Sequence, residues 1–217
     1  TPALGDTNNG TCRYGRFDGV NDAVFLLDSK PLATVNTASV AAWVRCGDCP
    51  TQPGLHEQRT IASIGTGWSH FGYVLGMDTK RGWMFAVQTT QGVKAAKLGK
   101  PADSNWHFVV GVFDGNKIQL YVDGKLVNEN VVQADIVWHP KQNTVMMGAT
   151  LKPSNAFRGD IDEVAFYKAA LSGQEVFSMT NTTHACVQCS PAVEVCDGVD
   201  NDCNGYTDDI DQDGDGA

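Results

Sequence analysis

An acidic stretch near the C-terminus, residues 200–211, reads Asp-Asn-Asp-Cys-Asn-Gly-Tyr-Thr-Asp-Asp-Ile-Asp. Side-chain oxygens fall at its first, third, fifth, ninth and twelfth positions. Glycine stands at the sixth position, and the seventh offers a backbone carbonyl, as in a twelve-residue calcium loop. The predicted ligands are Asp200, Asp202, Asn204, the Tyr206 carbonyl, Asp208 and Asp211. Hard carboxylate and amide oxygens favour Ca²⁺ over a transition metal. Mg²⁺ is less suitable because it keeps much of its bound water.

The same spacing begins again at Asp211, which we expect to close the first loop and to open a second. Asp213 and Asp215 would then be further ligands, with Gly214 and Gly216 beside them. Asp at the twelfth position reaches less far than Glu, so bidentate ligation there is less secure. The alternative is a solvated acidic linker, but regular spacing with correctly placed glycines argues against it. We predict that calcium orders residues 194–217 and protects them from proteases.

The chain contains seven cysteines, and four of them fall between residues 186 and 203 in a polar segment. A segment without a core of its own indicates disulfides and an oxidising compartment. Two Cys-x-x-Cys pairs, at 46–49 and 186–189, also fit a four-thiolate zinc site, although their wide separation is unusual for a zinc module. We predict disulfides, with one thiol left over because the count is odd. The candidates are Cys12, Cys46, Cys49, Cys186, Cys189, Cys196 and Cys203.

Two Trp-His clusters lie where loops are expected. Trp68 and His70 precede a predicted strand, and Trp138 and His139 lie between two strands. Exposed aromatic rings can stack on sugar faces, so these four residues are candidate ligand-binding residues. Packing at the rim of the fold beneath a loop is the alternative. By contrast, the tryptophans at 43, 83 and 106 sit in alternating strands and are predicted to be core residues.

The composition limits the classes of function. The 217 residues are 42% hydrophobic, which suffices for one large sandwich and an appendage. All 16 Lys and Arg residues lie within residues 1–168, together with 15 of the 25 acidic ones, so the acidity belongs to the C-terminal part. Without a basic patch we expect no nucleic-acid partner. No run approaches the ~20 apolar residues of a membrane helix, and membrane insertion is not expected. The chain begins without Met or a signal peptide, as a mature or excised segment would.

The elements that position these residues are strands. Within 105–127, three alternating apolar runs are joined by turns at Asp114-Gly115-Asn116 and Asp123-Gly124, which predicts an antiparallel meander. The segment 171–179 has helical spacing, with Ser172 as N-cap. Further strands are predicted at 39–45, 60–65, 71–77, 82–88, 92–98, 143–148 and 159–167. Many short strands with almost no helix favour a β-sandwich or jelly roll.

Five motifs follow one another in a familiar order: Phe-Asp-Gly-Val-Asn-Asp (17–22), Val-Ala-Ala-Trp-Val (40–44), Asn-Trp-His-Phe-Val (105–109), Leu-Tyr-Val-Asp-Gly (120–124) and Gly-Asp-Ile-Asp-Glu-Val-Ala-Phe-Tyr (159–167). This order resembles the laminin G-like, concanavalin A-like jelly-roll family, particularly its bacterial branch, over residues 12–180. The resemblance implies an all-β fold, a two-sheet antiparallel jelly-roll sandwich. Residues 1–11 would be an irregular lead-in, and residues 181–217 a Cys/Asp-rich calcium-binding repeat segment.

Residues 194–205, Glu-Val-Cys-Asp-Gly-Val-Asp-Asn-Asp-Cys-Asn-Gly, resemble the MopE-type metal-binding repeat of secreted bacterial proteins. Their spacing is similar to that of thrombospondin type 3 calcium repeats. In such a repeat a Cys196–Cys203 disulfide would staple the entry to the calcium loop.

Catalysis is not predicted. Jelly rolls of this family include glycoside hydrolases and polysaccharide lyases, and hydrolysis needs two carboxyl groups roughly 5–10 Å apart. Asp160 and Asp162 share one strand face, but Ala165 and Phe166 occupy the region in which the hydrolase pattern has its second Glu. No histidine makes a catalytic pattern, and the cysteines are predicted to be structural. A polysaccharide-degrading enzyme is therefore only the second alternative.

We expect a secreted or cell-surface bacterial module that binds calcium and recognises a glycan or an extracellular protein partner in adhesion. This function follows from the family resemblance. The first alternative is a structural repeat unit of an extracellular filament or surface assembly, able to self-assemble, in which calcium rigidifies the joint.

Overall fold

The computed structural model describes residues 3–5, 14–26, 36–49, 58–67, 70–78, 80–100, 102–138, 144–150 and 155–181. All of them belong to the first of two units into which the chain divides, Thr1–Thr183 and His184–Ala217. The calcium loop and five of the cysteines, at 12, 186, 189, 196 and 203, lie outside the described residues.

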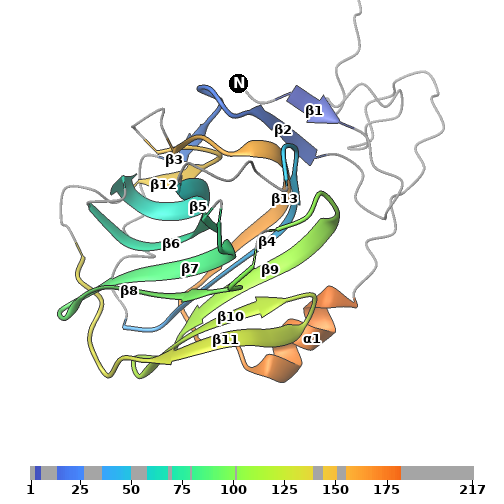
Figure 1. The fold of residues 1–217 in the computed structure, drawn as a ribbon. Helices are drawn as coiled ribbons and strands as arrows, with labels where there is room; N and C mark the ends of the chain where they lie inside the picture. The colour runs from blue at the N-terminus through green and yellow to red at the C-terminus, as the bar shows by residue number, and fades with distance from the viewer. Residues whose placement is uncertain are drawn as a thin grey trace, which may run out of the picture. The chain divides into compact units, whose positions relative to one another are not determined.

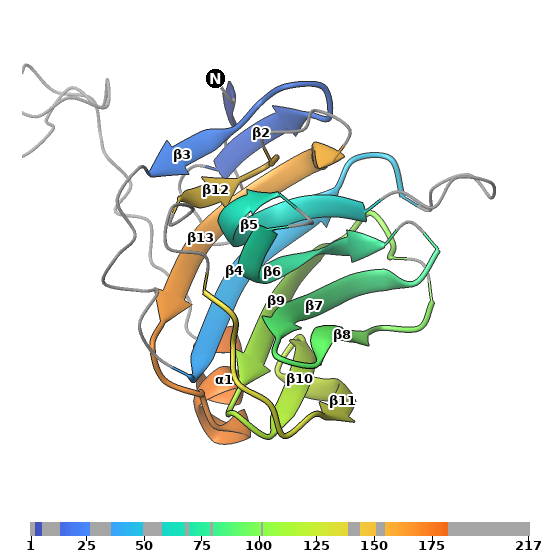
Figure 2. The ribbon, with the colours of Figure 1, turned by 90° about the vertical axis from the view of Figure 1, so that its left-hand side faces the viewer.

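The described strands form two antiparallel sheets that pack face to face (Figures 1 and 2). The seven-stranded sheet contains, in spatial order, β1 (Ala3–Gly5), β2 (Tyr14–Asp18), β13 (Arg158–Tyr167), β4 (Ala38–Cys46), β9 (Trp106–Phe113), β10 (Lys117–Val122) and β11 (Lys125–Val131). The six-stranded sheet contains β3 (Val24–Leu26), β12 (Val145–Met147), β5 (Gln58–Gly67), β6 (His70–Asp78), β7 (Gly82–Thr89) and β8 (Gly92–Lys97). The predicted two-sheet jelly-roll sandwich is therefore confirmed.

The meander predicted for 105–127 forms β9, β10 and β11. Asp114 shapes the first turn, because its Oδ1 accepts hydrogen bonds from the amides of Asn116 and Lys117 at 2.8 and 2.7 Å. The second turn needs positive φ angles, which are 51° at Asp123 and 75° at Gly124. This chemistry sets the register of the three strands.

The core lies between the sheets and follows from strand alternation. Trp83, Tyr73, Phe85, Phe113 and Phe157 are among its largest fully buried side chains. Trp83 is thus a core residue as predicted, whereas Trp43 and Trp106 are half-buried. These two lie on the outer face of the seven-stranded sheet, a position that the two-residue period alone could not distinguish from the core.

The helix α1 (Gly173–Thr180) covers part of that outer face (Figure 1). Ser172 is its N-cap as predicted, and Glu175 completes a capping box with it. Hydrogen bonds from the Ser172 hydroxyl and amide lower the pKa of Glu175. Val176 is fully buried in a cluster with Phe108 and Tyr121. The helix therefore covers the outer face of the sheet over part of β9 and β10.

Candidate functional site

A row of large polar and aromatic side chains crosses four neighbouring strands away from the helix. Arg16 on β2 lies directly opposite Asp160 on β13, which lies opposite Arg45 on β4, and Arg45 lies opposite Trp106 on β9. The residues next to them in sequence, such as Phe17 and Val44, belong to the core between the sheets. Because strand side chains alternate, the row faces outward.

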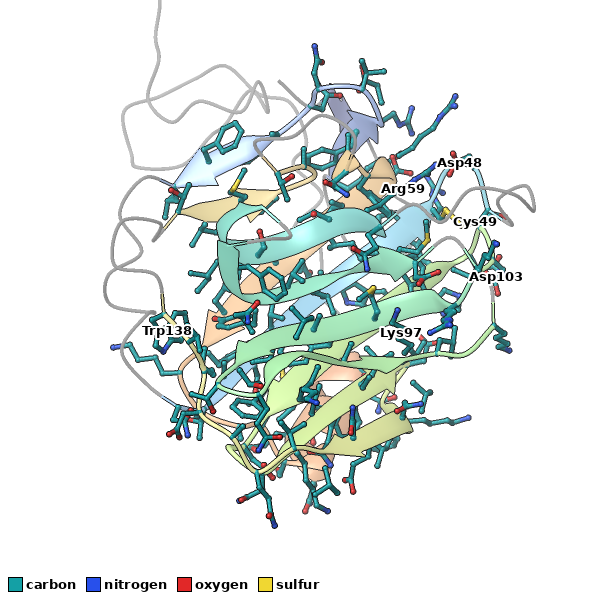
Figure 3. The ribbon with its side chains drawn as sticks, turned by 60° about the vertical axis from the view of Figure 1, so that its left-hand side comes forward. Asp48, Cys49, Arg59, Lys97, Asp103 and Trp138 are labelled. Carbon is teal, nitrogen blue, oxygen red and sulfur yellow. A yellow bond between two sulfur atoms is a disulfide. The ribbon has the colours of Figure 1, made fainter. Side chains whose placement is uncertain are left out.

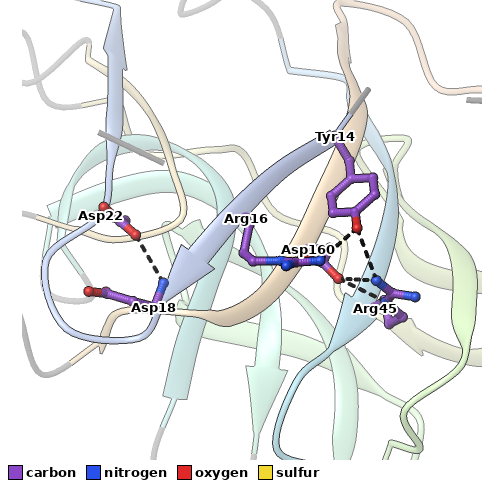
Figure 4. A network of polar contacts seen from close by, with 6 residues as sticks. All are labelled: Tyr14, Arg16, Asp18, Asp22, Arg45 and Asp160. Carbon is purple, nitrogen blue, oxygen red and sulfur yellow. Dashed lines mark hydrogen bonds and ion pairs between the residues drawn. The ribbon is translucent and has the colours of Figure 1, made fainter. Parts of the chain in front are cut away.

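Asp160 is the centre of this row (Figure 4). Its Oδ1 accepts a hydrogen bond from Nε of Arg16 at 3.0 Å. Its Oδ2 accepts two from Arg45, from Nε at 2.8 Å and from Nη2 at 2.6 Å. The Asp160 side chain is 8% exposed, against 57% for Arg16 and 35% for Arg45. One buried carboxylate thus fixes two arginines whose outer parts remain in water.

Two aromatic side chains also contact the arginines. The Tyr14 hydroxyl accepts hydrogen bonds from Nη2 of Arg16 at 2.6 Å and from Nη2 of Arg45 at 3.4 Å. The Arg45 guanidinium lies over the Trp106 ring, 5.1 Å from its centroid. The hydrogen bond and the charge of Asp160 raise the pKa of Arg16. Both guanidinium groups are consequently restrained in position.

A pocket of about 630 Å³ opens beside this row at the rim of the sandwich. Its lining includes Arg16, Arg45, Arg158, Ser104 and Asp160. The backbone forms part of the wall at Gly47 and Gly159, where the strands approach closely. A Cβ atom at Gly159, whose φ is 144°, would lie 2.1 Å from the Arg45 carbonyl oxygen. The size is that of a small-ligand site.

The acidic turn after β2 forms another part of the lining. Asp18 and Asp22 both line the pocket, and the Asp18 amide donates to Oδ2 of Asp22 at 3.0 Å. Oδ1 of Asp18 accepts the amides of Val20 and Asn21 at 2.7 and 3.4 Å. The hydrogen bond from the Val20 amide is the main cause of the lowered pKa of Asp18. Figure 4 shows these carboxylates on one side of Arg16, with Arg45 and Tyr14 on the other.

Cys46 and Cys49 form a disulfide at the end of β4, which confirms the prediction of disulfides for two of the seven candidate cysteines. Cys46 and Gly47 also line the pocket, so the bridged loop belongs to its wall. Asp48, between the cysteines, pairs with Arg59 on β5 at 2.6 Å. The donor atoms of Cys46, Asp48 and Cys49 lie within 4.8 Å of one another, a group that could hold a metal ion. Both sulfurs are oxidised here, and thiolate ligation requires the reduced form.

The aromatic residues predicted to contact a ligand do not line this pocket where the structure describes them. The half-buried Trp138 ring packs edge-on against Tyr73, with ring centroids 5.9 Å apart, and lies over Gly72. Figure 3 shows Trp138 at the opposite end of the sandwich from Asp48, Cys49 and Asp103. His70 begins β6, but its side chain lies outside the described residues, as do Trp68 and His139.

The two carboxylates considered for catalysis have separate environments. Asp160 is held by the two arginines, while Asp162 lies opposite Trp43, and its Oδ1 accepts the Glu163 amide at 2.8 Å. A general acid must deliver a proton to the substrate. Both Asp160 oxygens are already engaged by guanidinium groups, so this aspartate is suited to positioning arginines. The prediction that the chain is not an enzyme stays a prediction.

Sequence reasoning missed a charged cluster around His107. Its Nδ1 lies 2.7 Å from Oδ2 of Asp123, and its Nε2 lies 3.1 Å from Oδ1 of Asp103. Asp123 also accepts the Phe108 amide at 3.0 Å, which ties the turn between β10 and β11 to β9. The hydrogen bond that the His107 ring donates to Asp123, supported by the one to Asp103, raises the pKa of His107 against the opposing effect of burial. This cluster fastens two loops to one strand.

Comparison with known proteins assigns the fold. The model of the family described as the concanavalin A-like lectin/glucanases superfamily matches residues 18–177. The comparison with curated proteins found no match. None of the described helices is long and apolar enough to cross a membrane.

Three similar solved structures illustrate the range of proteins with this fold. One is domain 4 of AbnA, an extracellular GH43 arabinanase from Geobacillus stearothermophilus, which was solved in complex with arabinotriose. It is 17% identical to this chain, and the match has a TM-score of 0.63 and covers 83% of this chain and 82% of that chain. The binding domain of Paraclostridial Mosquitocidal Protein 1 is 10% identical with a TM-score of 0.62, covering 83% of this chain and 45% of that chain. The SAP-like pentraxin of Limulus polyphemus is 13% identical with a TM-score of 0.57, covering 78% and 82%.

These identities show a shared fold, and the family match ends before the acidic segment. The resemblance of residues 194–205 to the MopE-type repeat therefore stays a prediction. By its family match over residues 18–177, the chain belongs to the concanavalin A-like lectin/glucanases superfamily.

Proposed function

We propose that the chain is a secreted, lectin-like binding module that recognises a glycan or an extracellular protein partner at the rim pocket. The observation that carries this proposal is the pair of arginines fixed by Asp160 at the wall of a pocket of about 630 Å³. The Cys46–Cys49 disulfide supports an oxidising, extracellular setting. The similar domain of the arabinanase and the similar binding domain of the mosquitocidal protein support a binding role by analogy of fold.

The pocket is suited to a polar ligand because its groups are positioned before binding. Arg16 and Arg45 are restrained by Asp160 and Tyr14, so little side-chain entropy is lost when a ligand orders them further. The Asp18 carboxylate is held by the turn amides. A ligand with several hydroxyl groups can donate to the carboxylates and accept from the guanidinium groups at once.

A glycan array tests the proposal, together with a panel of extracellular matrix proteins. The exposed Ser104 lines the pocket without taking part in the arginine network, so Ser104→Tyr places a bulky ring in the pocket while leaving Asp160 paired. Gln91→Tyr, at an exposed turn between β7 and β8, is the matched control. We expect binding by the parent chain and the control, and loss of binding in Ser104→Tyr. Equal binding by all three would place the ligand elsewhere.

We also propose calcium as the ion of the acidic segment, on the donor chemistry of its residues alone. The ligands would be Asp200, Asp202, Asn204, the Tyr206 carbonyl, Asp208 and Asp211, with Asp213 and Asp215 in a second loop. Oxygen donors at this spacing suit Ca²⁺. Isothermal titration with CaCl₂ tests this, with Asp200→Asn and Asp202→Asn expected to weaken binding strongly.

Self-assembly is the second candidate function. Leu126 and Val131 on β11 are 48% and 61% exposed, and Phe177 on α1 is 58% exposed. β11 is the last strand of its sheet among the described residues, and such an edge can pair with another chain. Sedimentation velocity across a range of concentrations tests this candidate. Association that Leu126→Lys abolishes supports it, whereas a monomer at all concentrations contradicts it.

A further inference from the structure

We infer that the rim pocket selects acidic glycans, whose carboxylate or sulfate group binds Arg16 and Arg45. This inference rests on the proposed function and specifies its ligand class. A neutral sugar could use the polar groups of the pocket, but the local positive charge of the row and the geometry of its donors favour an anionic one.

The row itself carries one positive charge in excess, whereas the whole pocket lining is balanced, with Arg158 and the two arginines of the row against Asp18, Asp22 and Asp160. Arg16 and Arg45 both pair with Asp160, the one acidic partner recorded for either of them among the described residues. A second anion beside these two guanidinium groups would therefore balance the local charge of the row. Both guanidinium groups also converge on the Tyr14 hydroxyl through their Nη2 atoms, so they present neighbouring positive charge.

The donor count of the arginines leads to the same ligand. A guanidinium group has five N–H donors. Arg16 and Arg45 each use Nε and Nη2 for Asp160 or Tyr14. Within the described part of the chain, no acceptor is recorded for Nη1 of either residue. Since both side chains are partly exposed, these donors are available to a planar carboxylate or a sulfate.

The acidic turn on the side of the pocket away from Arg45 would orient the ligand. Asp18 and Asp22 would repel an anion next to them, so the acidic group belongs at the Arg45 side (Figure 4). Hydroxyl groups, in contrast, can donate to these carboxylates. The pocket is therefore polarised, with acceptors for hydroxyl groups at the turn and donors for an anion at the row.

This polarity favours an acidic glycan over an acidic peptide. A sugar ring carries an acidic group and several hydroxyl donors within one residue. A glutamate or aspartate residue of a peptide adds to its carboxylate only one backbone donor and one carbonyl acceptor. The pocket has acceptors on Asp18 and Asp22 that the hydroxyl groups would use.

An array of matched neutral and acidic glycans provides the first test, with uronic acids and sulfated sugars in separate arms and a hexaglutamate peptide as the protein-like arm. We expect retention of one acidic arm, with binding that falls as salt is raised. Equal retention of neutral and acidic partners would overturn this inference and leave the proposed function standing. Retention of the peptide alone would overturn the glycan assignment. If neither the glycans nor the proteins of the earlier panel bind, the proposed function fails as well.

Calorimetric titration of the best acidic glycan provides the second test. Arg16→Gln removes the more exposed arginine and leaves Asp160 paired with Arg45. We expect affinity for the acidic glycan to fall about tenfold, the loss typical of one charge-assisted contact. Arg81→Gln removes an equally charged, exposed side chain in the turn between β6 and β7, so it should leave affinity unchanged. Thermal unfolding checks that both variants are folded. Equal losses in the two variants would contradict the assigned role of Arg16.

Discussion

Replacing Asp160 by Asn tests the central structural claim, that one buried carboxylate holds two arginines in place. The amide offers one acceptor oxygen and directs an N–H₂ group toward guanidinium donors. It also leaves Arg16 and Arg45 as neighbouring like charges, both bonded to the Tyr14 hydroxyl. Three charge-assisted hydrogen bonds, at 3.0, 2.8 and 2.6 Å, are lost or weakened together.

The expected loss of stability lies between two limits. Removing one partner of a fully buried ion pair costs about 3–5 kcal/mol, whereas an exposed pair is worth about 0–1 kcal/mol. Asp160 is 8% exposed, but its partners are 57% and 35% exposed, so water compensates for part of the loss. We expect Asp160→Asn to lower the free energy of unfolding by about 2–3 kcal/mol. In a chain of this size the Tm falls by roughly 4–12 °C.

Urea denaturation followed by circular dichroism measures this difference. Glu129→Gln is the matched control, because Glu129 pairs with Lys117 at 2.9 Å at the surface and the chemical change is the same. The control should lose less than about 1 kcal/mol. Combining Asp160→Asn with Arg16→Gln should be less destabilising than the sum of the single changes, because Arg16→Gln removes one of the two positive charges that repel each other once Asp160 is replaced. A loss for Asp160→Asn that equals the control's would refute the buried-carboxylate argument.

Three further predictions follow from other parts of the chain. The pKa of His107 is raised by Asp123 and Asp103, so its contribution to stability is full below pH 6.5 and is lost as pH rises through the folded-state pKa. The unfolding free energy, measured by urea titration from pH 6 to 9, should therefore fall less steeply with pH in His107→Gln than in the parent chain, and equal pH slopes in the two proteins would contradict the role of the cluster. The Cys46–Cys49 bridge closes a short loop, so replacing both cysteines by serine should cost about 2 kcal/mol, a loss that differential scanning calorimetry detects. Calcium should slow proteolysis of residues 194–217, as followed by mass spectrometry, and identical cleavage with calcium and with chelator would contradict the calcium loop.

The strands and the helix could be predicted from the sequence because their signals are local. Alternation, the Asp114 and Asp123 turns and the Ser172 cap each act within a few residues, and the structure confirms all of them. The His107 cluster was predictable in principle. Pairing Ile118 with Phe113 across the first turn places Asp123 opposite Phe108, next to His107. A residue-by-residue count of the hairpin register would have found it.

The arginine row could not be predicted in the same way, because it depends on pairing between distant strands. Arg16, Arg45 and Asp160 each alternate with core residues, so their outward orientation could be inferred separately. Their alignment depends on β13 pairing with both β2 and β4 in one register. A one-residue slip would have turned Asp160 toward the core. Interpreting Asp160 and Asp162 as a carboxylate pair missed the arginines for this reason.

The outer face of the seven-stranded sheet explains why a binding site can occupy this position. Where α1 covers the face, apolar side chains such as Phe108 and Val110 are buried and contribute to stability. Away from the helix, the residues of the same face need not be apolar, and Arg16, Asp160 and Arg45 replace hydrophobic packing with charge pairing. Of these three side chains only that of Asp160 is deeply buried, so the arginines can vary their outer contacts without exposing the core. A fold that is stabilised between its sheets can therefore carry different ligand-binding side chains on the part of this face that α1 does not cover, and we expect substitutions at the exposed Arg16 to change ligand preference more than stability.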